Sequence, residues 1–344
     1  MRAPHPSSVT YVTGRRNRFS IDGSRTWAVL IGIDSYNDPM SLLRGCVRDA
    51  LDMRTYLMED LIVPEDRIQL LLSPHPYRDT VSDTTAFQVL VNPIGHIFRN
   101  LYPELLATSS CSLPTRENII RTLVNLSTNS KIQRSDHIIV FFSGHGSSYA
   151  CSSYFKDDIG RSGNVEVLCP MDRTSRNVPH RSIIPDISDR EINVILKRIC
   201  HAKGHQITVI LDCCHSGGAT RLPDTGIRLA LPVEGSLRHV LEAAEKQRKN
   251  GADHVSVLSG DWKPDTFSHV VLAACKEYQL AKEVTGDDGK SAGVFTGALL
   301  RTLRYGPLTS NSTYVELHRA LPSSSSQTPV VAGQHKTERI WFQK

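Results

Sequence analysis

Two motifs that lie far apart in the sequence carry side chains that could form a nucleophilic pair. Residues 206–218 read QITVILDCCHSGG, an apolar run that ends in an acid, two cysteines and a histidine. Residues 137–146 read HIIVFFSGHG, a second apolar run that ends in a histidine between two glycines. A thiol has a reference pKa near ~8.5, so it needs an adjacent imidazole to react as the thiolate. The two motifs therefore predict a Cys/His pair made of Cys214 and His145.

The glycines that flank His145 make it the better candidate for the base. Gly144 and Gly146 would let a substrate backbone come close to the imidazole. His215 is next to Cys214 in the chain, but consecutive side chains diverge at the end of a strand, so it is the weaker candidate. The amides of Gly146 and Cys214 are predicted to be oxyanion donors, because a preorganised pair of N–H groups lowers the barrier to acyl transfer.

These side chains can meet only if the strands that carry them end at the same place. Both apolar runs lack polar alternation, which indicates strands buried on both faces, as in a parallel sheet. The carboxyl ends of parallel strands share one edge, where ligands collect. A further apolar run at 26–34 is followed by a predicted helix at 45–61, whose first turn carries Cys46 and Asp49 three residues apart. Cys46 and Asp49 are therefore expected at the same edge as Cys214.

Runs typical of strands and of amphipathic helices alternate along most of the chain. The predicted strands are 26–34, 67–73, 137–146, 165–169, 207–211, 269–275 and, at the end of the chain, 339–342. The predicted helices are 45–61, 115–126, 189–199, 294–303 and 314–321. This alternation predicts an α/β fold, a three-layer sandwich with a mostly parallel central sheet and helices on both faces.

The chain is predicted to consist of a short arm and one large domain. Residues 1–25 hold arginines without apolar periodicity and are predicted to be a flexible basic arm. The domain at 26–344 is predicted in three parts: 26–220, an exposed loop at 221–265, and 266–344. A helical turn or two is expected near 237–246 within that loop. The segment 74–113 looks like an elaborated connection to which the sequence assigns no function.

Composition argues against several classes of protein. The 344 residues are 40% hydrophobic and 22% charged, which suits a folded protein. The formal charge is +5, but the arm alone holds five arginines against one acid, so the rest of the chain is close to neutral and does not predict nucleic-acid binding. No apolar run approaches ~18 residues and no secretory signal is apparent, so we expect neither a membrane span nor secretion. Eight cysteines without CxxC pairs favour a reducing compartment over a disulfide framework or a zinc site.

Taken together, SGHG at 143–146 and DCCHSG at 212–217 resemble the metacaspases, the fungal, plant and protist branch of the caspase-like cysteine peptidases. The segments AVLIGID, GCVRDA, PTREN, EVLCPMD and ISDREI are similar to further parts of that family. The resemblance covers about 26–344, apart from parts of 74–113. It implies a caspase-like sandwich and a thiol protease of programmed cell death, with Cys214 as the nucleophile and His145 as the general base.

The same resemblance implies cleavage after Arg or Lys. The acidic pocket of the family matches Cys46, Asp49, Ser143 and Asp212 in this sequence. Two carboxylates in a dry pocket attract a guanidinium or ammonium group and repel an acidic side chain, which separates this prediction from the Asp preference of true caspases. Arg48 stands where the family usually has Asn, and the sequence leaves open whether it points outward or lies over the pocket.

Many metacaspases are activated by calcium at a site of several acidic residues, and that site is altered here. The segment ISDREI supplies Asp189 but has Arg190 for the second acid. Arg221 stands seven residues after Cys214, and the acidic turn before EVLCPMD is replaced by Ser-Gly. Calcium takes about six to eight oxygen ligands, most of them anionic, and cations in its shell oppose binding. We therefore predict that calcium activation is weakened or lost and that no cofactor is needed.

Two alternatives to this prediction stay open at the level of sequence. The first is a catalytically silent caspase-like module that binds partners or reports signals through its arm. The intact set of Cys214, His145, Asp49 and Asp212 argues against it. The second is another caspase-clan peptidase with a different side-chain preference.

The expected partners are protein or peptide substrates with Arg or Lys at the cleaved position, with no nucleic acid and no membrane. We expect a monomer in the cytoplasm, with the nucleus as the alternative. Such an enzyme could also cut itself in the predicted loop at 221–265, because exposed loops are where nicking occurs. The basic residues offered for this are Arg238, Lys246, Arg248, Lys249 and Lys263.

Overall fold

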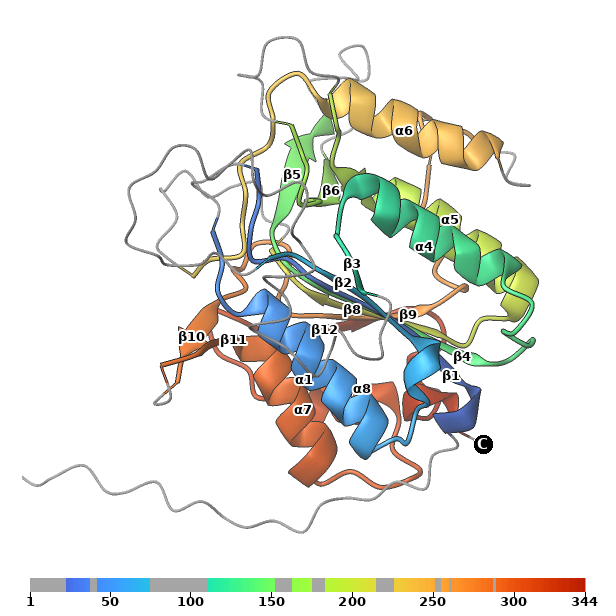
Figure 1. Cartoon of the computed structure of the whole chain (residues 1–344), viewed down its shortest axis with the longest axis vertical. Coiled ribbons are helices and arrows are strands. Elements are labelled where there is room, and N and C mark those ends of the chain that lie inside the picture. The colour runs from blue at the N-terminus through green and yellow to red at the C-terminus, as the bar shows by residue number, and fades with distance from the viewer. Residues whose placement is uncertain are drawn as a thin grey trace, which may run out of the picture.

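A seven-stranded sheet lies at the centre of the computed structural model (Figure 1). Its order is β12-β9-β8-β4-β1-β2-β3; β12 runs antiparallel to β9, and the other neighbours are parallel. The strands are β1 (Thr26–Gly32), β2 (Ile68–Leu72), β3 (Cys111–Ser112), β4 (His137–Ser143), β8 (Ile207–Asp212), β9 (Val270–Ala273) and β12 (Val330–Ala332). The prediction of a mostly parallel central sheet is confirmed.

The structure describes residues 23–37, 42–74, 111–151, 163–174, 183–214, 226–250, 255–259, 262–286 and 289–343. The arm predicted at 1–25 lies outside these residues, except for a 3-10 turn at Gly23–Arg25 (η1). Most of the connection predicted at 74–113 also lies outside them. A second 3-10 turn, Glu65–Arg67 (η3), leads into β2.

Helices cover both faces of the central sheet (Figure 1). One apolar core joins one face of the sheet to α1, α7 and α8. A second core joins the other face to α4 and α5. The helices are α1 (Cys46–Glu59), α4 (Arg116–Thr128), α5 (Asp189–Lys203), α7 (Val294–Tyr305) and α8 (Tyr314–Ala320). The predicted three-layer α/β sandwich is therefore confirmed.

A smaller antiparallel sheet packs beyond the second layer. It has the order β5-β6-β7 and is covered by a further helix, α6, whose Leu237, Val240 and Leu241 are buried against it. The elements are β5 (Gly146–Ala150), β6 (Asn164–Leu168), β7 (Ile187–Ser188) and α6 (Leu237–Lys249). The predicted helical turn or two near 237–246 was therefore too short. The predicted exposed loop at 221–265 is also wrong in part. Helix α6 buries an apolar stripe, which is hard to recognise in the sequence because charged residues surround it.

The predicted strand at 339–342 is not formed. Residues Ile340–Phe342 make a 3-10 turn (η5), and β12 is the strand that completes the sheet near the end of the chain. The indole N–H of Trp341 donates to the hydroxyl of Tyr56 at 3.2 Å, and its backbone N–H donates to the hydroxyl of Tyr314 at 3.1 Å. Burial of this large ring therefore overrides the β propensity of the segment.

Strand register brings the ends of three strands to one place. Gly32 of β1 is level with Ser143 of β4, which is level with Asp212 of β8. A Cβ atom at Gly32 would lie 2.6 Å from the carbonyl oxygen of Cys46, so glycine lets the first turn of α1 lie against the strand. The expected meeting of α1 with the ends of β4 and β8 follows from this close contact.

Candidate active site

Cys214 lies just after β8, and its side chain is fully buried. Its Sγ accepts a hydrogen bond from the Ala281 amide at 2.9 Å and donates to the Ala281 carbonyl oxygen at 3.4 Å. Burial raises the pKa of the Cys214 thiol well above its ordinary value, and neighbouring Cys275 raises it further. The thiol is therefore neutral in this state of the molecule.

His145 lies in the turn between β4 and β5 and is 3% exposed. Its backbone N–H donates to the hydroxyl of Tyr36 at 2.6 Å, and the Tyr36 ring packs on the imidazole with ring centroids 4.9 Å apart. Tyr36 follows β1 and thus belongs to the same edge of the sheet. It fixes the position of the histidine from the side of β1, a role that the sequence did not indicate.

The glycines on either side of His145 are needed for close packing. A Cβ atom at Gly144 would lie 2.7 Å from the Tyr36 hydroxyl. A Cβ atom at Gly146 would lie 1.9 Å from the Cys214 carbonyl oxygen, so no other residue fits there. The start of β5 therefore lies directly against the residue that carries the thiol.

The amides of Gly146 and Cys214 point at one oxygen atom. Both donate to the carbonyl oxygen of Arg228, each at 3.1 Å. Two converging backbone N–H groups on one carbonyl oxygen are the arrangement that stabilises the oxyanion of an acyl-transfer reaction. The structure thus brings together the two amides predicted for this role, although the role itself stays a prediction.

Three of the four side chains predicted for the acidic pocket lie around a side chain of the same protein, Arg228. Asp49 comes from α1, Ser143 from the end of β4 and Asp212 from the end of β8. The Nη2 atom of Arg228 lies 2.6 Å from Asp49 Oδ2, and its Nη1 lies 2.9 Å from Asp212 Oδ2 and 2.9 Å from Ser143 Oγ. Ser143 also donates to Asp49 Oδ2 at 2.9 Å. The Arg228 side chain is 0% exposed, so the pocket holds a fully desolvated guanidinium.

Further donors keep the two carboxylates in place. The Gly293 amide donates to Asp49 Oδ1 at 2.9 Å. The backbone N–H and the hydroxyl of Thr296, near the start of α7, donate to Asp212 Oδ2 at 3.1 and 2.6 Å. Burial raises the pKa of Asp49 to about 6, against the opposite effect of Arg228. A cation in the pocket is therefore what keeps this carboxyl ionised near neutral pH.

Cys46 lies beside the pocket, where its thiol is hydrogen-bonded with Ser143. It is fully buried in the first turn of α1, where its amide donates to Asp34 Oδ1 at 2.7 Å. Burial raises the pKa of its thiol well above the ordinary value, while Arg228 lowers it. Cys46 therefore forms part of the wall of the pocket as a neutral group.

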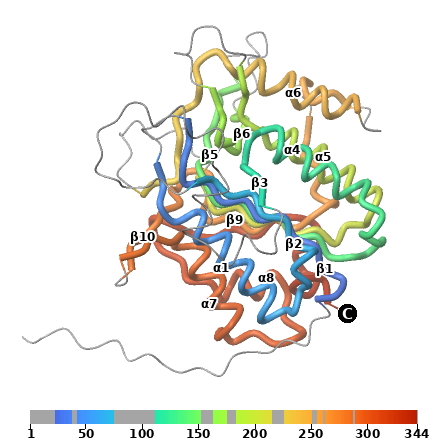
Figure 2. The backbone as a smooth tube through the Cα atoms, viewed as in Figure 1, coloured from blue at the N-terminus to red at the C-terminus, as the bar shows by residue number. Residues whose placement is uncertain are grey.

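Several residues of the site were missed at the level of sequence. Arg228 falls in the stretch predicted to be an exposed loop, yet it is the occupant of the pocket. Gly293, from the short hairpin β10 (Glu283–Thr285) and β11 (Ser291–Gly293), closes the pocket: a Cβ atom there would lie 2.3 Å from Asp212 Oδ2 and 2.6 Å from Arg228 Nη1. Glu283 accepts hydrogen bonds from the Gly45 amide at the start of α1, where Figure 2 places β10 beside the helix. Gly293 in SAGVF and the apolar residues around Arg228 in GIRLA were the available signals.

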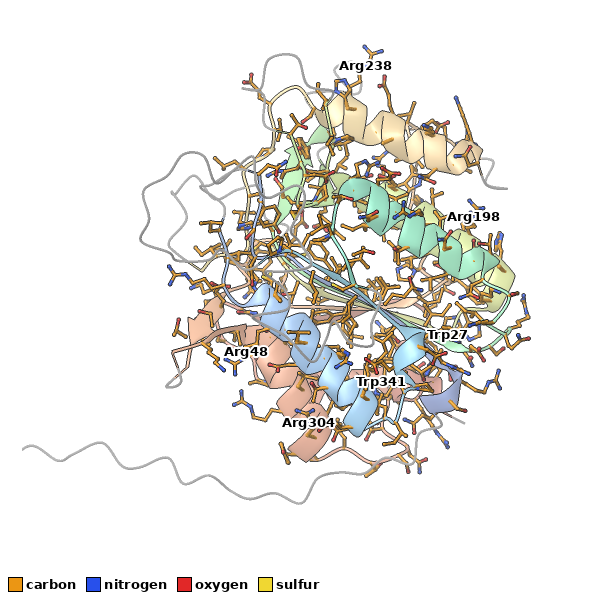
Figure 3. The ribbon with its side chains drawn as sticks, in the orientation of Figure 1. Trp27, Arg48, Arg198, Arg238, Arg304 and Trp341 are labelled. Carbon is orange, nitrogen blue, oxygen red and sulfur yellow. The ribbon has the colours of Figure 1, made fainter. Side chains whose placement is uncertain are left out.

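Arg48 does not lie over the pocket. Its guanidinium is 3.7 Å from Asp52 on the next turn of α1, and the two side chains are 37% and 49% exposed. Figure 3 shows Arg48 on the outside of the helix. The alternative in which it extends outward is therefore the one that the structure supports.

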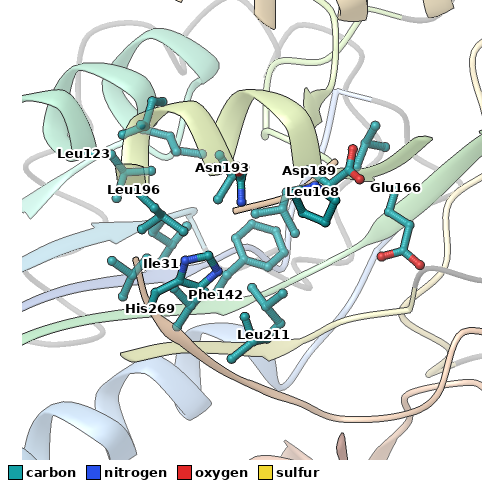
Figure 4. Close-up of a pocket in the computed structure, with 18 of the residues that line it drawn as sticks. Ile31, Leu123, Phe142, Glu166, Leu168, Asp189, Asn193, Leu196, Leu211 and His269 are labelled. Atoms are coloured by element: carbon teal, nitrogen blue, oxygen red, sulfur yellow. The ribbon is translucent and has the colours of Figure 1, made fainter. Parts of the chain in front are cut away.

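Of the residues at the altered calcium site, Asp189 and Arg190 are described, whereas Ser162 and Arg221 lie outside the described residues. Glu166 of β6 and Asp189 of α5 lie at one end of an apolar cavity of about 210 Å³ (Figure 4). The adjacent Arg190 donates to the carbonyl oxygen of Val257 and packs on the ring of Trp262 at 5.0 Å. No group of three or more His, Cys, Asp and Glu side chains is arranged for a metal among the described residues. Two carboxylates beside a guanidinium supply fewer anionic oxygens than calcium usually takes, and loss of calcium activation stays a prediction.

In the part of the chain that the structure describes, no helix is both long and apolar enough to cross a membrane.

Comparison with known proteins gives one consistent family. Residues 25–340 match the family described as Caspase domain. Metacaspase-1B of Aspergillus oryzae is 25% identical over 346 residues, which covers 93% of this chain and 70% of that protein. Metacaspase-1 of Candida glabrata is 24% identical and covers 96% of this chain and 78% of that protein. A crystal structure of a Geobacter sulfurreducens protein has a similar fold, with a TM-score of 0.51, 18% identity, and coverage of 92% of this chain and 98% of that one.

Proposed function

The chain belongs to the caspase domain family of cysteine peptidases, and on that premise we propose that it is an endopeptidase that cleaves peptide bonds after Arg or Lys. Cys214 is the nucleophile and His145 the general base of this proposal. The amides of Gly146 and Cys214 stabilise the oxyanion, and Asp49, Ser143 and Asp212 bind the basic side chain before the cleaved bond.

The observation that carries the proposal is the guanidinium of Arg228 between two buried carboxylates. A charged group is removed from water at high cost unless partners replace its hydration, and here Asp49, Asp212 and Ser143 all lie within 2.9 Å of it. The same pocket would repel an acidic side chain. The carbonyl group of the bound arginine lies on the two amide donors, so the pocket and the oxyanion donors serve one and the same residue.

The proposed reaction proceeds through an acyl-enzyme. The thiol of Cys214 adds to the carbonyl carbon of the basic residue, and His145 takes the thiol proton and delivers it to the leaving amine. A thioester of the basic residue remains on Cys214. Water, deprotonated by His145, then hydrolyses this thioester and restores the thiol.

Fluorogenic peptides that differ only in the residue before the fluorophore test the proposal. We expect peptides with Arg or Lys to be hydrolysed on the order of 100-fold faster than the Asp peptide. The Cys214→Ala variant should have no turnover, whereas Cys213→Ala, which removes the adjacent buried thiol, should keep it. Equal turnover by wild type and Cys214→Ala would remove the assignment of the nucleophile. Preference for Asp would remove the assignment of the pocket.

The alternative of a silent binding module is not favoured, because the chain keeps Cys214 and His145 at the ends of neighbouring strands and directs two backbone amides at one carbonyl oxygen. A monomer without nucleic-acid or membrane partners and a cytoplasmic location belong to the proposal as well. Size-exclusion chromatography at two protein concentrations would check the first of these.

A further inference from the structure

Tyr36 lies beside His145 on a segment whose backbone is fixed on both sides. The Ser35 amide donates to the hydroxyl of Ser73, just after β2, at 3.2 Å. The Asn37 amide donates to the Met171 carbonyl oxygen at 3.1 Å. The Tyr36 side chain therefore extends from a backbone with little freedom to move. Supporting contacts of this kind hold a group in the geometry that a reaction needs.

The Tyr36 hydroxyl holds the backbone of His145. It accepts a hydrogen bond from the His145 amide at 2.6 Å, and the His145 carbonyl oxygen accepts one from the Cys169 amide at 3.0 Å. A Cβ atom at Gly144 would lie 2.7 Å from the same hydroxyl, so glycine at this position leaves room for the bond. The imidazole of His145 is therefore carried by a backbone that cannot tilt without breaking one of the two bonds.

The Tyr36 ring packs on the imidazole itself. The two ring centroids are 4.9 Å apart, and the ring planes are inclined by 47°. The face of a phenol ring carries partial negative charge, and it attracts a cation that lies within about 6 Å of the centroid. Burial raises the pKa of the Tyr36 hydroxyl well above its ordinary value, so the phenol stays neutral. Because Tyr36 and His145 are 7% and 3% exposed, water weakens the attraction little.

The proposed reaction creates a cation at this position. When His145 takes the proton of the Cys214 thiol, the imidazole becomes an imidazolium. This charge develops only as the reaction proceeds. A group that stabilises the imidazolium therefore raises kcat and leaves KM almost unchanged. The face of the Tyr36 ring is placed to be such a group.

We propose that Tyr36 is a positioning residue of the reaction: its hydroxyl orients His145, and the face of its ring stabilises the imidazolium that forms when His145 takes the thiol proton. This inference rests on the proposed function. It gives Tyr36 no proton to transfer and no contact with the substrate, so Tyr36 acts through His145 alone.

Fluorinated phenylalanines at position 36 test the role of the ring. Fluorine withdraws electrons from the face of the ring and changes its size very little. Full-length Tyr36→Phe is compared with the same protein carrying 4-fluoro-, 3,5-difluoro- or 3,4,5-trifluorophenylalanine at this position, with an Arg peptide as substrate. We expect kcat to fall with each added fluorine, by about tenfold across the series, and KM to stay within about twofold. A ring that serves only for packing would give equal kcat in all four proteins.

Two natural substitutions separate the ring from the hydroxyl. Tyr36→Leu removes both and should lower kcat by about 30- to 100-fold, with KM within about twofold of wild type. Tyr36→Phe keeps the ring but leaves the His145 amide without its acceptor. It should lower kcat by less than about fivefold and lower the Tm by a few degrees.

Tyr56 supplies the matched control. It is a second buried tyrosine, 1% exposed, and its hydroxyl accepts a hydrogen bond from the Trp341 indole at 3.2 Å, away from the candidate active site. Tyr56→Leu makes the same chemical change and should lower the Tm, but kcat per folded molecule should stay at the wild-type value. An equal loss of kcat in Tyr56→Leu and Tyr36→Leu would assign the effect to destabilisation and overturn the inference.

The remaining outcomes distinguish the inference from the proposed function. If wild type hydrolyses Arg peptides but kcat is equal across the fluorinated series, or Tyr36→Leu keeps wild-type kcat, the inference is wrong and the proposed function stands. If Tyr36→Leu does not fold, the fluorinated series decides, because each of its members keeps an aromatic ring. If wild type does not hydrolyse Arg peptides, the proposed function fails and takes the inference with it.

Discussion

Two pairs of buried or half-buried carboxylates among the described residues can be compared, and one of the two has a guanidinium between its members. Asp49 and Asp212 contact Arg228 at 2.6 and 2.9 Å in a fully buried pocket. Glu166 and Asp189 lie near each other at the end of an apolar cavity (Figure 4), and the guanidinium of Arg190 is directed to the Val257 carbonyl oxygen instead. We name these the pocket pair and the cavity pair.

Burial raises pKa values in both pairs, and the pairs differ in the groups that contact the carboxylates. In the cavity pair, burial followed by repulsion from Asp189 raises the pKa of Glu166 to about 7, and burial raises that of Asp189 to about 6. In the pocket pair, burial also raises the pKa of Asp49, but Arg228 and four hydrogen bonds stabilise the charged carboxylates. Glu166 has the highest of these pKa values, because burial and the charge of Asp189 raise it together. The pocket pair is thus suited to bind a basic side chain and the cavity pair is not.

The largest effect should come from neutralising the pocket pair. Asp49→Asn and Asp212→Asn each leave a buried guanidinium short of one carboxylate, which costs about 3–5 kcal/mol and should lower kcat/KM for an Arg peptide by roughly 100- to 1,000-fold. Steady-state kinetics of the purified variants checks this. The matched control is Asp52→Asn, on the exposed side of the same helix, which should keep wild-type kinetics.

A comparable loss in Glu166→Gln would contradict the distinction between the two pairs. We expect that variant to hydrolyse the Arg peptide as wild type does, since Glu166 lines the apolar cavity and not the pocket around Arg228. Circular dichroism on all four variants would exclude loss of folding as the cause.

A smaller loss should follow from filling the wall of the pocket. A Cβ atom at Gly293 would lie 2.3 Å from Asp212 Oδ2 and 2.7 Å from Asp49 Oδ2, so Gly293→Ala must displace both carboxylates. We expect kcat/KM for an Arg peptide to fall by about 10- to 100-fold, mainly through KM. The control is Gly297→Ala on α7, where the new Cβ meets only the end of Arg301 at 3.8 Å. That variant should be as active and more stable by about 0.5–1 kcal/mol.

The sequence predicted the pocket pair but not its occupant, and the difference has a physical basis. Asp212 and His145 follow buried apolar runs, and parallel strands must end at a common edge, so local pattern and one topological rule place both residues. Arg228 is placed instead by the charge of Asp49, 179 residues away in the chain. A contact between residues so far apart in the chain produces no apolar periodicity around Arg228. The residues around Arg228 were therefore predicted to be exposed.

The same limit explains the errors in the outer elements of the fold. The central sheet and its covering helices were predictable because each buries a regular apolar pattern. Helix α6 has a highly charged sequence around a narrow apolar stripe, which packs on β5 and β6. Trp341 turns the chain out of the predicted strand to bury its indole between Tyr56 and Tyr314. The positions of α6 and Trp341 both depend on packing partners that are distant in the sequence and come close only in the folded protein.

Neutralising Glu166 of the cavity pair should have a modest, pH-dependent effect on the stability of the fold. The folded-state pKa of Glu166 lies near 7 against 4.5 for an ordinary glutamate, so the folded protein holds this proton more tightly than the unfolded chain. Its contribution to stability is complete below about pH 4.5 and is lost as pH rises through 7. Glu166→Gln should therefore match wild type at pH 4.5 and exceed it at pH 8 by on the order of 1 kcal/mol, or about 2–3 °C in Tm.

Thermal melts across this pH range check the expectation. Glu117→Gln serves as the control, because that carboxylate is 85% exposed and its removal should change Tm at neither pH. A Glu166→Gln variant that is less stable than wild type at pH 8 would show that the carboxylate is held in its charged form, which is the opposite of the cavity pair as described.

The smallest expected effect is that of calcium. A calcium ion at the cavity pair would have to bind beside Arg190, whose guanidinium is fixed by the Val257 carbonyl oxygen and the Trp262 ring, and would find two half-buried carboxylates that favour protons. We therefore expect 1 mM calcium, compared with 1 mM magnesium, to change neither the Tm nor the rate of Arg-peptide hydrolysis beyond experimental error. A steep calcium requirement would reject this prediction. If Arg190→Asp then showed a calcium-dependent rise in Tm that wild type lacks, the guanidinium itself would be identified as the group that excludes the metal.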